Sequence, residues 1–575
     1  MQTKPSSQLV ENRNPLGRAL RSFFHSQPNS QMKLNPMKTN KRNSIEPLEQ
    51  RIAPALTSAA VSLGGITALT GASLGGAVDN DNLGTSVHEA GDVNGDGIGD
   101  FIVGAPFAGT GGLNQGAAYV VFGKDSGAPL NITPSSLNGS NGFAIFGAED
   151  GSRFGSSVSS AGDVNGDGFG DIVIGAPKFN GSNVQRGAAY VVFGHGGSFG
   201  SSFNVSALDN TQAFSVEGAG TQDFLGTSVS NAGDVNGDGF GDIIVGSPNG
   251  NGDAADSGAA YILYGHSHFT GKIFTSILTA TEGVKLGGIA ANDKAGTSVS
   301  GGHDINGDGF DDVIVGAPLA NEGGTNHGAA YVVFGKSNLA LNTPLSGLGG
   351  TSGFRLSGVS DGDQAGFSVS LVGDLNGDGL SEIGVGAPLA NEGGIDRGAA
   401  YVVFGKSANF SNPIALSGLD GHNGFKAVGN FANDFLGSSV SGAGDINGDG
   451  HADLIVGASG ATVNGQITGS AYVLYGKAGD FAATRTLSSL DGQDGIRLPG
   501  LAPGANTGVS VSAAGDVNHD GFGDVIVGSS FAPAGGLQRG DGMSSMVAPP
   551  APRMSHLSSA PTTRPPPSPM SMAIW

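Results

Sequence analysis

The sequence of 575 residues contains no cysteine and a single tryptophan, and only 13% of its residues are charged. Without cysteine the chain can form neither a disulfide framework nor a thiolate metal site. Its 27 lysine and arginine residues are outnumbered by 49 aspartate and glutamate residues, which gives a formal net charge of −22. This balance argues against nucleic acid as a partner, because phosphate binding needs clustered lysine and arginine.

Long hydrophobic runs are also missing. The best candidate, residues 52–77, is uncharged but rich in glycine, serine and threonine, so we expect no transmembrane segment. The chain has no GxSxG nucleophile elbow between a strand and a helix, no HExxH motif and no P-loop, and no catalytic constellation is found. His266 and His268, in the stretch GHSH, could form a metal pair but are expected to be surface residues.

Glycine, by contrast, is abundant, with 104 residues, and much of it belongs to an internal repeat. The motif Asp-x-Asn-(Gly or His)-Asp-Gly recurs at intervals of 70 or 71 residues. Each copy follows a Ser-Val pair and precedes an apolar run such as DIVIGAP (171–177), and GAAYVVFG (187–194) comes later. The motif begins at Asp92, Asp163, Asp234, Asp304, Asp374, Asp445 and Asp516.

The apolar runs within each repeat have the composition of β-strands. They are short, rich in valine, isoleucine, tyrosine and phenylalanine, and bounded by glycine, asparagine, aspartate and proline. Each repeat holds four such runs. The sequence therefore predicts an all-β fold, a seven-bladed β-propeller of four-stranded antiparallel blades, with disordered N- and C-terminal tails.

The two ends of the chain differ from the repeats. Residues 1–55 are predicted to be a basic, disordered export or targeting segment, residues 56–540 the propeller, and residues 541–575 a disordered tail rich in proline and serine. The repeat breaks off abruptly near residue 540, where a third strand is expected, so we interpret the tail as a product of a frameshift. Residues 65–71 are predicted to join the last blade and so close the ring.

The acidic stretch of each repeat has the pattern of a calcium loop. Oxygen ligands at positions 1, 3, 5, 7 and 9 can converge on one ion, with position 7 contributing its backbone carbonyl and glycines at positions 4 and 6 permitting the tight turn. The predicted ligands are Asp92, Asn94, Asp96, Ile98, Asp100, Asp163, Asn165, Asp167, Phe169, Asp171, Asp234, Asn236, Asp238, Phe240, Asp242, Asp304, Asn306, Asp308, Phe310, Asp312, Asp374, Asn376, Asp378, Leu380, Glu382, Asp445, Asn447, Asp449, His451, Asp453, Asp516, Asn518, Asp520, Phe522 and Asp524.

Other interpretations of these loops fit less well. An EF-hand needs a glutamate at position 12 and flanking helices, whereas position 12 here is an apolar strand residue such as Ile174. Magnesium demands a stricter octahedron, and zinc prefers nitrogen or sulfur ligands. Simple turn chemistry explains one copy but not a series that always keeps position 9 acidic. Two copies depart from the pattern, with Glu382 at position 9 and His519 at position 4. We expect up to seven Ca²⁺ ions.

The set FGSSV (154–158), DVNGDGFGDIVIGAP (163–177) and GAAYVVFG (187–194) resembles the FG-GAP repeat, the unit of the integrin alpha-chain propeller. The resemblance implies a calcium-binding propeller, often extracellular and adhesive, with ligand on the face opposite the calcium loops. That face would carry Arg186, Glu322, Glu392, Asp396 and Arg397. The stretch SIEPLEQRIAPA (44–55) is similar to a short motif near the start of exported proteins of planctomycete-like bacteria.

The sequence thus predicts a secreted or cell-surface binding or adhesion module that takes a protein or glycan ligand and is a monomer. Two alternatives remain open. One is a propeller-based hydrolase or carbohydrate-active enzyme that uses a groove on one face. The other is a structural component of a surface layer.

Overall fold

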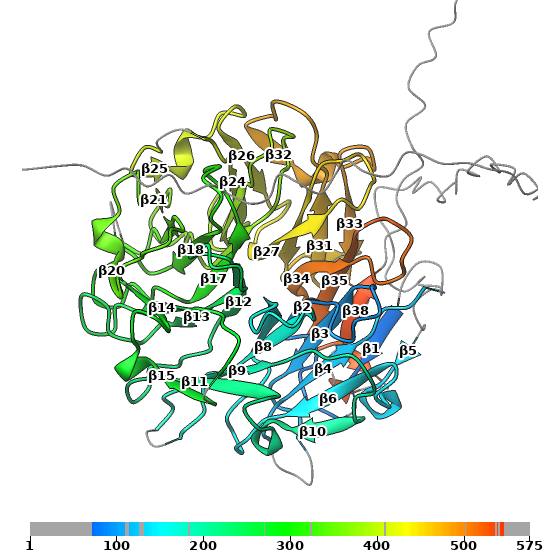
Figure 1. The fold of residues 1–575 in the computed structure, drawn as a ribbon. Helices are drawn as coiled ribbons and strands as arrows, with labels where there is room; N and C mark the ends of the chain where they lie inside the picture. Colours follow the sequence, from blue (N-terminus) through cyan, green and yellow to red (C-terminus); the bar gives the residue numbers. More distant parts are fainter. Residues whose placement is uncertain are drawn as a thin grey trace, which may run out of the picture. The chain divides into compact units, whose positions relative to one another are not determined.

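The computed structural model describes residues 72–545, apart from 77, 110–113, 126–130, 182–183, 270, 322–324, 408–409, 501, 535–536 and 539–540. The described chain is all-β (Figure 1). Its helical segments there are single 3₁₀ turns: η2 (Pro134–Ser136), η3 (Val205–Ala207), η4 (Thr275–Ile277), η5 (Leu345–Gly347), η6 (Leu416–Gly418) and η7 (Leu487–Ser489). None of these turns approaches the length or apolarity needed to cross a membrane.

The strands form large sheets, which we call blades. From the inner edge outward, the first blade contains β2 (Ser86–Gly91), β3 (Asp100–Ala105), β4 (Ala117–Val121), β6 (Gly142–Phe146) and β10 (Ser202–Asn204). The second contains β7 (Ser157–Gly162), β8 (Asp171–Ala176), β9 (Ala188–Val192), β11 (Ala213–Glu217) and β15 (Lys272–Phe274). The third contains β12 (Val229–Gly233), β13 (Asp242–Ser247), β14 (Ala259–Leu263), β16 (Gly283–Gly287) and β20 (Asn342–Pro344).

The later blades follow the same order. They contain β17 (Ser298–His303), β18 (Asp312–Ala317), β19 (Ala329–Val333), β21 (Gly353–Ser357) and β25 (Ile414–Ala415); β22 (Ser368–Leu371), β23 (Ile383–Ala387), β24 (Ala399–Val403), β26 (Gly424–Val428) and β32 (Thr484–Thr486); β27 (Leu436–Gly444), β28 (Asp453–Ala458), β31 (Ser470–Leu474) and β33 (Gly495–Pro499); and β34 (Thr507–Gly515), β35 (Asp524–Ser529), β38 (Asp541–Ser545), β1 (Ala72–Gly75) and β5 (Asn131–Ile132). Two small ribbons pair β29 (Thr462–Val463) with β30 (Gln466–Ile467) and β36 (Pro533–Ala534) with β37 (Leu537–Gln538).

The prediction of a seven-bladed propeller of four-stranded antiparallel blades is wrong. Six blades are five-stranded, and their fifth strand pairs in parallel, as β10 does with β6; only the sheet β27–β28–β31–β33 has four strands in the described chain. The fifth strands are two or three residues long and mostly polar, for example Ser202–Asn204. Such a segment has no hydrophobic alternation, so it reads as a loop in the sequence.

The hydrophobic core lies within and between the blades. Every residue of strands such as β8 (DIVIGA) and β9 (AAYVV) is buried, whereas the inner strand β2 has two buried positions among half-buried ones. Short runs of β-branched and aromatic residues suit central strands that are covered on both faces. The inner strands contact their neighbours in a closed circuit of β2, β7, β12, β17, β22, β27 and β34, which returns to β2.

A repeated hydrogen bond joins neighbouring blades. The hydroxyl of a serine in or next to each inner strand donates to the carbonyl oxygen of the Phe-Gly-type glycine in the next blade. The pairs, at 2.9–3.2 Å, are Ser86–Gly155, Ser157–Gly226, Ser228–Gly296, Ser298–Gly366, Ser368–Gly437, Ser439–Gly508 and Ser510–Gly84. The last pair links the end of the chain to its beginning.

The two ends of the chain meet in one blade. In Figure 1 the blue strand β1 lies beside the orange-red β38, and the two pair in antiparallel register, with Leu74 opposite Gly542. The chain ends therefore share a sheet as predicted, but through residues 72–75; residues 65–71 lie outside the described residues. The expected loss of the third strand is wrong, because β38 pairs with β35 in that place. The beginning of the predicted disordered tail thus forms a strand.

Candidate metal centres

The seven acidic loops each connect the first and second strands of a blade. Position 9 is the first residue of the second strand in most copies, as Asp100 is for β3, and Glu382 directly precedes β23. Positions 4 and 6 have positive φ, for example 75° at Gly166 and 90° at Gly168. The glycines are therefore required at this turn, as the sequence indicated.

Backbone N–H groups gather around the first aspartate of each loop. In the loop at Asp163, one carboxylate oxygen accepts from the N–H groups of Gly166 (2.7 Å) and Asp167 (3.0 Å), and the other accepts from Gly168 (2.9 Å). The side chain of Asn165 also accepts from the N–H of Asp167 (2.8 Å), and Asp167 Oδ1 accepts from the N–H of Phe169 (3.0 Å). Hydrogen bonds between backbone N–H groups and side-chain oxygens thus connect positions 1, 3, 5 and 7 of the loop.

Position 9 is different, because its carboxylate is buried and braces the blade. Asp171 is fully buried, and its oxygens accept from the N–H groups of Val164 and Gly194, both at 2.9 Å. These bonds join the acidic loop to the end of the third strand. Asp100, Asp242, Asp312 and Asp453 make the equivalent pair of bonds. Sequence reasoning treated position 9 as a ligand only and missed this structural role.

Burial raises the pKa of the position 9 carboxyl groups, and the carboxylates at positions 1 and 5 raise it further by repulsion. For Asp171 the pKa rises to about 8 despite the two backbone hydrogen bonds, which act in the opposite direction. The same pKa of about 8 applies to Asp100, Asp242, Asp312, Glu382 and Asp524, and the pKa of Asp453 is also raised. Each loop therefore concentrates negative charge beside a buried acid.

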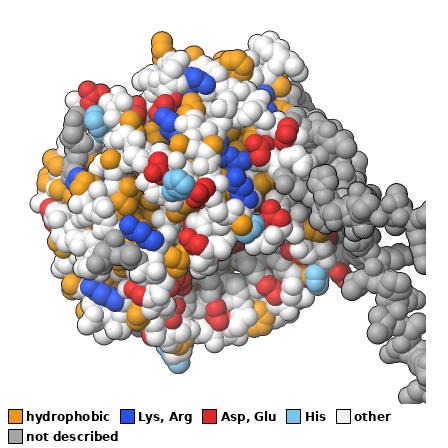
Figure 2. Space-filling view, turned by 90° about the horizontal axis from the view of Figure 1, so that it is seen from above, with side chains coloured by type: hydrophobic (Ala, Val, Ile, Leu, Met, Phe, Trp, Pro, Cys, Tyr) orange, Lys and Arg blue, Asp and Glu red, His pale blue; other side chains and the backbone are white. Residues whose placement is uncertain are grey.

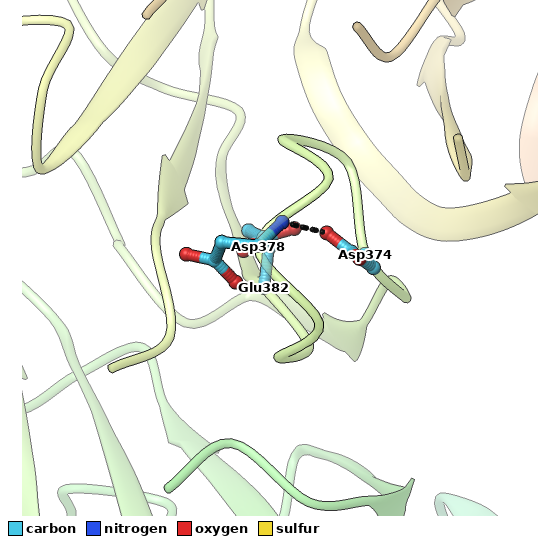
Figure 3. Close-up of side chains that lie close together, drawn as sticks. All are labelled: Asp374, Asp378 and Glu382. Atoms are coloured by element: carbon cyan, nitrogen blue, oxygen red, sulfur yellow. Dashed lines mark hydrogen bonds between the residues drawn. The ribbon is translucent and has the colours of Figure 1, made fainter. Parts of the chain in front are cut away.

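The fifth loop brings three carboxylates closest together. One oxygen each of Asp374, Asp378 and Glu382 lies within 4.8 Å of the others, and this is the one such group of His, Cys, Asp or Glu side chains among the described residues. Figure 3 shows the three side chains on one turn, where the N–H of Asp378 donates to Asp374 (3.1 Å). The extra methylene of Glu382 accounts for this convergence. The sequence identified Glu382 as a departure from the pattern.

Neighbouring loops are also coupled, which the sequence did not predict. The N–H at position 8 of one loop donates to the carbonyl oxygen at position 1 of the loop before it, for example Gly170 to Asp92 (2.9 Å) and Gly241 to Asp163 (2.9 Å). The ring of Phe169 lies against Gly95 of the preceding loop, where a Cβ would be 2.3 Å from the ring. Position 4 is therefore glycine for reasons of packing as well as of turn geometry.

The last loop shows how the departure at position 4 is accommodated. His519 adopts a positive φ of 57°, and its Nδ1 lies 3.5 Å from Asp125 of the first repeat. Position 7 in that first repeat is Ile98, which is smaller than the phenylalanine found in most copies. The one loop with a side chain at position 4 is thus followed by a blade whose position 7 residue is smaller than phenylalanine.

The opposite ends of the blades carry the loops between strands 2 and 3 and between strands 4 and 1. Arg186, predicted to lie on that face, is buried and pairs with Glu217 (3.1 Å). Glu392 pairs with Lys426 (2.7 Å), and Arg397 donates to the carbonyl oxygens of Gly429 and Glu392. Glu322 lies outside the described residues. These charges therefore serve largely to hold loops in place.

Exposed apolar side chains gather on these same loops. Of the large hydrophobic residues that are exposed in the described chain, only Ile277 lies elsewhere, in η4; the others are Val78, Val184, Phe367, Ile395, Phe431 and Ile467. Ile395 is 69% exposed and Phe431 63% exposed. They belong to adjacent loops, since the N–H of Asn433 donates to the carbonyl oxygen of Ile395 (2.9 Å). Sequence reasoning singled out charges on this face and overlooked these residues.

The sequence model of the FG-GAP repeat matches residues 89–121, 154–192, 225–263, 295–333, 436–474 and 507–544. These are six copies, compared with the seven predicted from the acidic motif. The unmatched repeat is the one that contains Glu382, the residue that completes the closest carboxylate cluster.

Similar proteins include a phosphatidylinositol-glycan-specific phospholipase D of Dictyostelium discoideum, 29% identical over 319 residues, or 54% of this chain and 32% of that protein. Integrin alpha-5 of Xenopus laevis is 30% identical over 245 residues, 41% of this chain and 20% of its own length. Integrin alpha pat-2 of Caenorhabditis elegans is 30% identical over 296 residues, 49% of this chain and 21% of its own. The chain thus spans a fifth to a third of the length of these relatives.

Proposed function

The chain is an FG-GAP repeat protein with an integrin-alpha-like β-propeller, and from this we propose that it is a secreted or cell-surface binding module whose acidic loops hold calcium. The relatives named above are integrins and a phospholipase D, and this chain matches only part of each. The proposal therefore concerns a binding module and does not extend to the activity of those whole proteins.

The convergence of Asp374, Asp378 and Glu382 carries the calcium proposal. Burial and the neighbouring carboxylates of Asp378 and Asp374 raise the pKa of Glu382 to about 8, because three charged groups this close would repel one another. No lysine or arginine among the described residues forms an ion pair with them. A bound cation removes the repulsion. The donors are all oxygen atoms on a flexible turn, which suits calcium better than zinc or magnesium. An extracellular location would supply the calcium that sites with a Kd of about 10⁻⁴–10⁻³ M require.

Isothermal titration with CaCl₂ tests the calcium sites. The variant Glu382→Gln keeps the size of the side chain and an oxygen acceptor for the Leu375 N–H, but it removes one charge from the cluster. We expect it to weaken calcium binding at the fifth loop by at least about tenfold and to leave the other loops unchanged. Glu392→Gln, in the same repeat but outside the acidic loop, is the matched control and should titrate like the parent protein. Equal titrations for all three proteins would contradict the assignment.

For the ligand surface we propose the face opposite the acidic loops, centred on Ile395 and Phe431. Apolar groups gathered on one face mark a recognition surface. On the side of the propeller that is uppermost in Figure 1, Figure 2 shows acidic, basic and hydrophobic side chains interspersed, without a large continuous hydrophobic area among the described residues. The exposed apolar residues on the loops between strands 2 and 3 and between strands 4 and 1 are therefore the better candidates.

Arrays of glycans and extracellular matrix proteins, probed in calcium and in EDTA, test this part of the proposal. We expect binding in calcium that EDTA abolishes. The double variant Ile395→Ser/Phe431→Ser should lose binding with an unchanged melting temperature, and Ile277→Ser, which alters an equally exposed residue in η4, should bind normally. Turnover of a bound glycan would favour the enzyme alternative, and calcium-independent binding would contradict the proposal.

A further inference from the structure

One blade has an outer edge without a strand partner in the described chain. In six blades a fifth strand covers the outer strand, as β32 covers β26 with Arg485 opposite Ala427. The corresponding edge of β33 has no such strand among the described residues. A row of unpaired backbone N–H and C=O groups is a template for another strand.

A cavity lies next to this edge, at a position that is filled in the neighbouring blades. In the blade before it, the ring of Phe481 enters from the following repeat and packs on Phe425 with 4.9 Å between ring centroids and on Phe404 with 5.6 Å. Its N–H donates to the carbonyl oxygen of Gly421 (3.0 Å). Phe199, Phe269 and Phe410 are placed in the same way in other blades.

At the equivalent place beside β33 the structure has a cavity of about 770 Å³. Tyr475 and Gly492 line it in the positions that Phe404 and Gly421 hold beside Phe481, and Leu490 lines it as well. The hydroxyl group of Tyr475 is buried and has no hydrogen-bond partner among the described residues. The cavity combines apolar side chains such as Leu490 with polar and charged ones such as Lys477 and Asp494. It lies beside an open strand edge, and this mixed lining suits an extended polypeptide segment.

The topology explains why this blade differs from the others. Each fifth strand lies in the connection between the third and fourth strands of the following repeat, as β10 lies between β9 and β11. For the blade of β33 the following repeat has β38 as its third strand and β1 as its fourth. These two strands lie at opposite ends of the chain, so no continuous connection joins them. The missing strand must come from the segment before β1, from the segment after β38, or from another molecule.

The segment before β1 matches the register of the other repeats. Ser73 of β1 occupies the place of Arg497 in β33, since they lie opposite Met543 and Tyr472, the middle residues of their respective third strands. When Ser73 is aligned with Arg497 and the two segments are compared residue by residue towards the N-terminus, Leu63 aligns with Leu487 and Ile66 with Leu490. Leu487 and Leu490 are buried; Leu487 is the first residue of η7 and Leu490 directly follows it. The segment Ser62-Leu63-Gly64-Gly65-Ile66 therefore has the pattern of Thr486-Leu487-Ser488-Ser489-Leu490.

We propose that residues 60–62 of this chain form the fifth strand on β33. The same alignment places Ala60 opposite Arg497, Val61 opposite Leu498 and Ser62 opposite Pro499 in parallel pairing, as Thr484, Arg485 and Thr486 lie opposite residues of β26. Residues 56–59, which include Leu56 and Thr57, then enter the cavity beside Tyr475 and Leu490. The N-terminal segment thereby ties the last blade to the one before it, in addition to β1.

The segment after β38 fits this place less well. Leu557 and the serines that follow it resemble Leu487 and its neighbours, but Ala560 stands where the second leucine is required. The spacing from the third to the fifth strand also varies, from Val333 to Asn342 in one repeat and from Val403 to Ile414 in another. The spacing from the fifth strand to the fourth is constant in every repeat, which favours residues 60–62.

Disulfide trapping in the full-length chain tests the proposal, because the protein has no cysteine of its own. A disulfide forms only when the two Cα atoms are about 4.4–6.8 Å apart. The test pair is Ala60→Cys/Arg497→Cys. The positive control is Thr484→Cys/Lys426→Cys, an equivalent pair that the structure already places opposite each other. Two further pairs, Ser62→Cys/Arg497→Cys and Met554→Cys/Arg497→Cys, probe a shifted register and the C-terminal segment.

We expect the test pair to oxidise as completely as the positive control in the folded protein and neither pair to oxidise in denaturant. The crosslinked peptides are identified by mass spectrometry. Trapping through residue 554 in place of residue 60 would overturn the assignment in favour of the C-terminal segment. Efficient trapping of the positive control, without any bond from residue 60 or 554, would also overturn it and leave the edge of β33 to a strand from another molecule.

Discussion

At the scale of single residues, the propeller contains a second set of buried acids, on the side away from the acidic loops. Asp223, Asp293, Asp363 and Asp434 recur two residues before the Leu or Ala of the Leu-Gly or Ala-Gly pair, and each is at least nine-tenths buried. Burial raises the pKa of each above its ordinary value. The folded protein is therefore more stable when these carboxyl groups are protonated than when they are charged.

Asp293 gives the clearest prediction of this set. Its Oδ2 accepts from the N–H of Ala290 (2.9 Å), whereas its Oδ1 is buried without a partner in the described chain. Its folded pKa is raised above the unfolded value, so its contribution to stability is full below about pH 4 and is lost as the pH rises through the folded pKa. Asp293→Asn removes the buried charge. We expect it to stabilise the protein by about 1 kcal/mol at pH 8 and to have little effect at pH 4.

Urea unfolding at the two pH values measures this effect. Asp491→Asn alters an exposed aspartate that accepts a local backbone hydrogen bond and should change stability equally little at both pH values. Ser152 occupies the place of Asp293 in another repeat, so an uncharged residue fits this position. A variant that is destabilised at pH 8 would show that the charge of Asp293 is needed.

The residues of the acidic loops could largely be predicted from the sequence, since ligand-type oxygens at alternate positions are visible as a pattern. The sequence could not show that the carboxylate at position 9 also braces the third strand, as Asp171 does through Gly194, because the partner lies 23 residues away. Burial of acids such as Asp293 could not be predicted either, because an aspartate next to a turn reads as a solvated loop residue.

At the scale of strands, the glycines of the repeat let neighbouring blades approach closely. A Cβ on Gly246 of β13 would lie 2.1 Å from the carbonyl oxygen of Gly296 in the next blade, and Gly104 of β3 meets Gly155 in the same way. The Phe-Gly and Gly-Ala-Pro parts of the repeat therefore meet across a blade boundary. This contact explains why two short motifs, separated by many residues, recur together.

Gly246→Ala tests the close approach. Because the obstructing atom belongs to the backbone, relief requires the blades to move apart, and we expect a loss of about 3 kcal/mol or more in the free energy of unfolding. Gly349→Ala is the matched control. A Cβ added to Gly349 would have no heavy atom within 4 Å, and this glycine has no positive φ, so the substitution should be nearly neutral. Equal stability of the two variants by chemical denaturation would contradict this account of the blade boundary.

Four strands per repeat could be read from the sequence because each is an apolar run between turn residues. The fifth strand could not, because Ser202–Asn204 and its equivalents pair mainly through their backbone. Strand β38 was also missed. It lies where the side-chain pattern of the repeat has ended, and backbone pairing with β35 and β1 forms it nonetheless.

At the scale of the whole molecule, the ring depends on strand β1 because the last blade is made from both chain ends. Leu74 of β1 is buried, and the strand pairs with β38 on one side and β5 on the other. Ser510 and Gly84 complete the series of hydrogen bonds between blades. A ring closed in this way has no exposed inner edge between its first and last blades.

Deletion of residues 1–75 tests this closure. The shortened chain lacks β1, so β38 and β5 lose their common partner, and we expect the melting temperature to fall by several degrees or the protein to aggregate. Deletion of residues 1–55 leaves β1 in place and should have little effect on the melting temperature. A stable, monomeric protein after the longer deletion would show that the ring closes without β1.

The account depends most on the acidic loops being cation sites, and thermal melting of the full-length protein in 10 mM CaCl₂, 10 mM MgCl₂ and EDTA tests it most directly. A ligand at ten times its Kd adds about 1.4 kcal/mol of stability per site, and several loops act together. We predict a melting temperature many degrees higher in calcium than in EDTA, with magnesium close to EDTA. The same melting temperature under all three conditions would contradict the account.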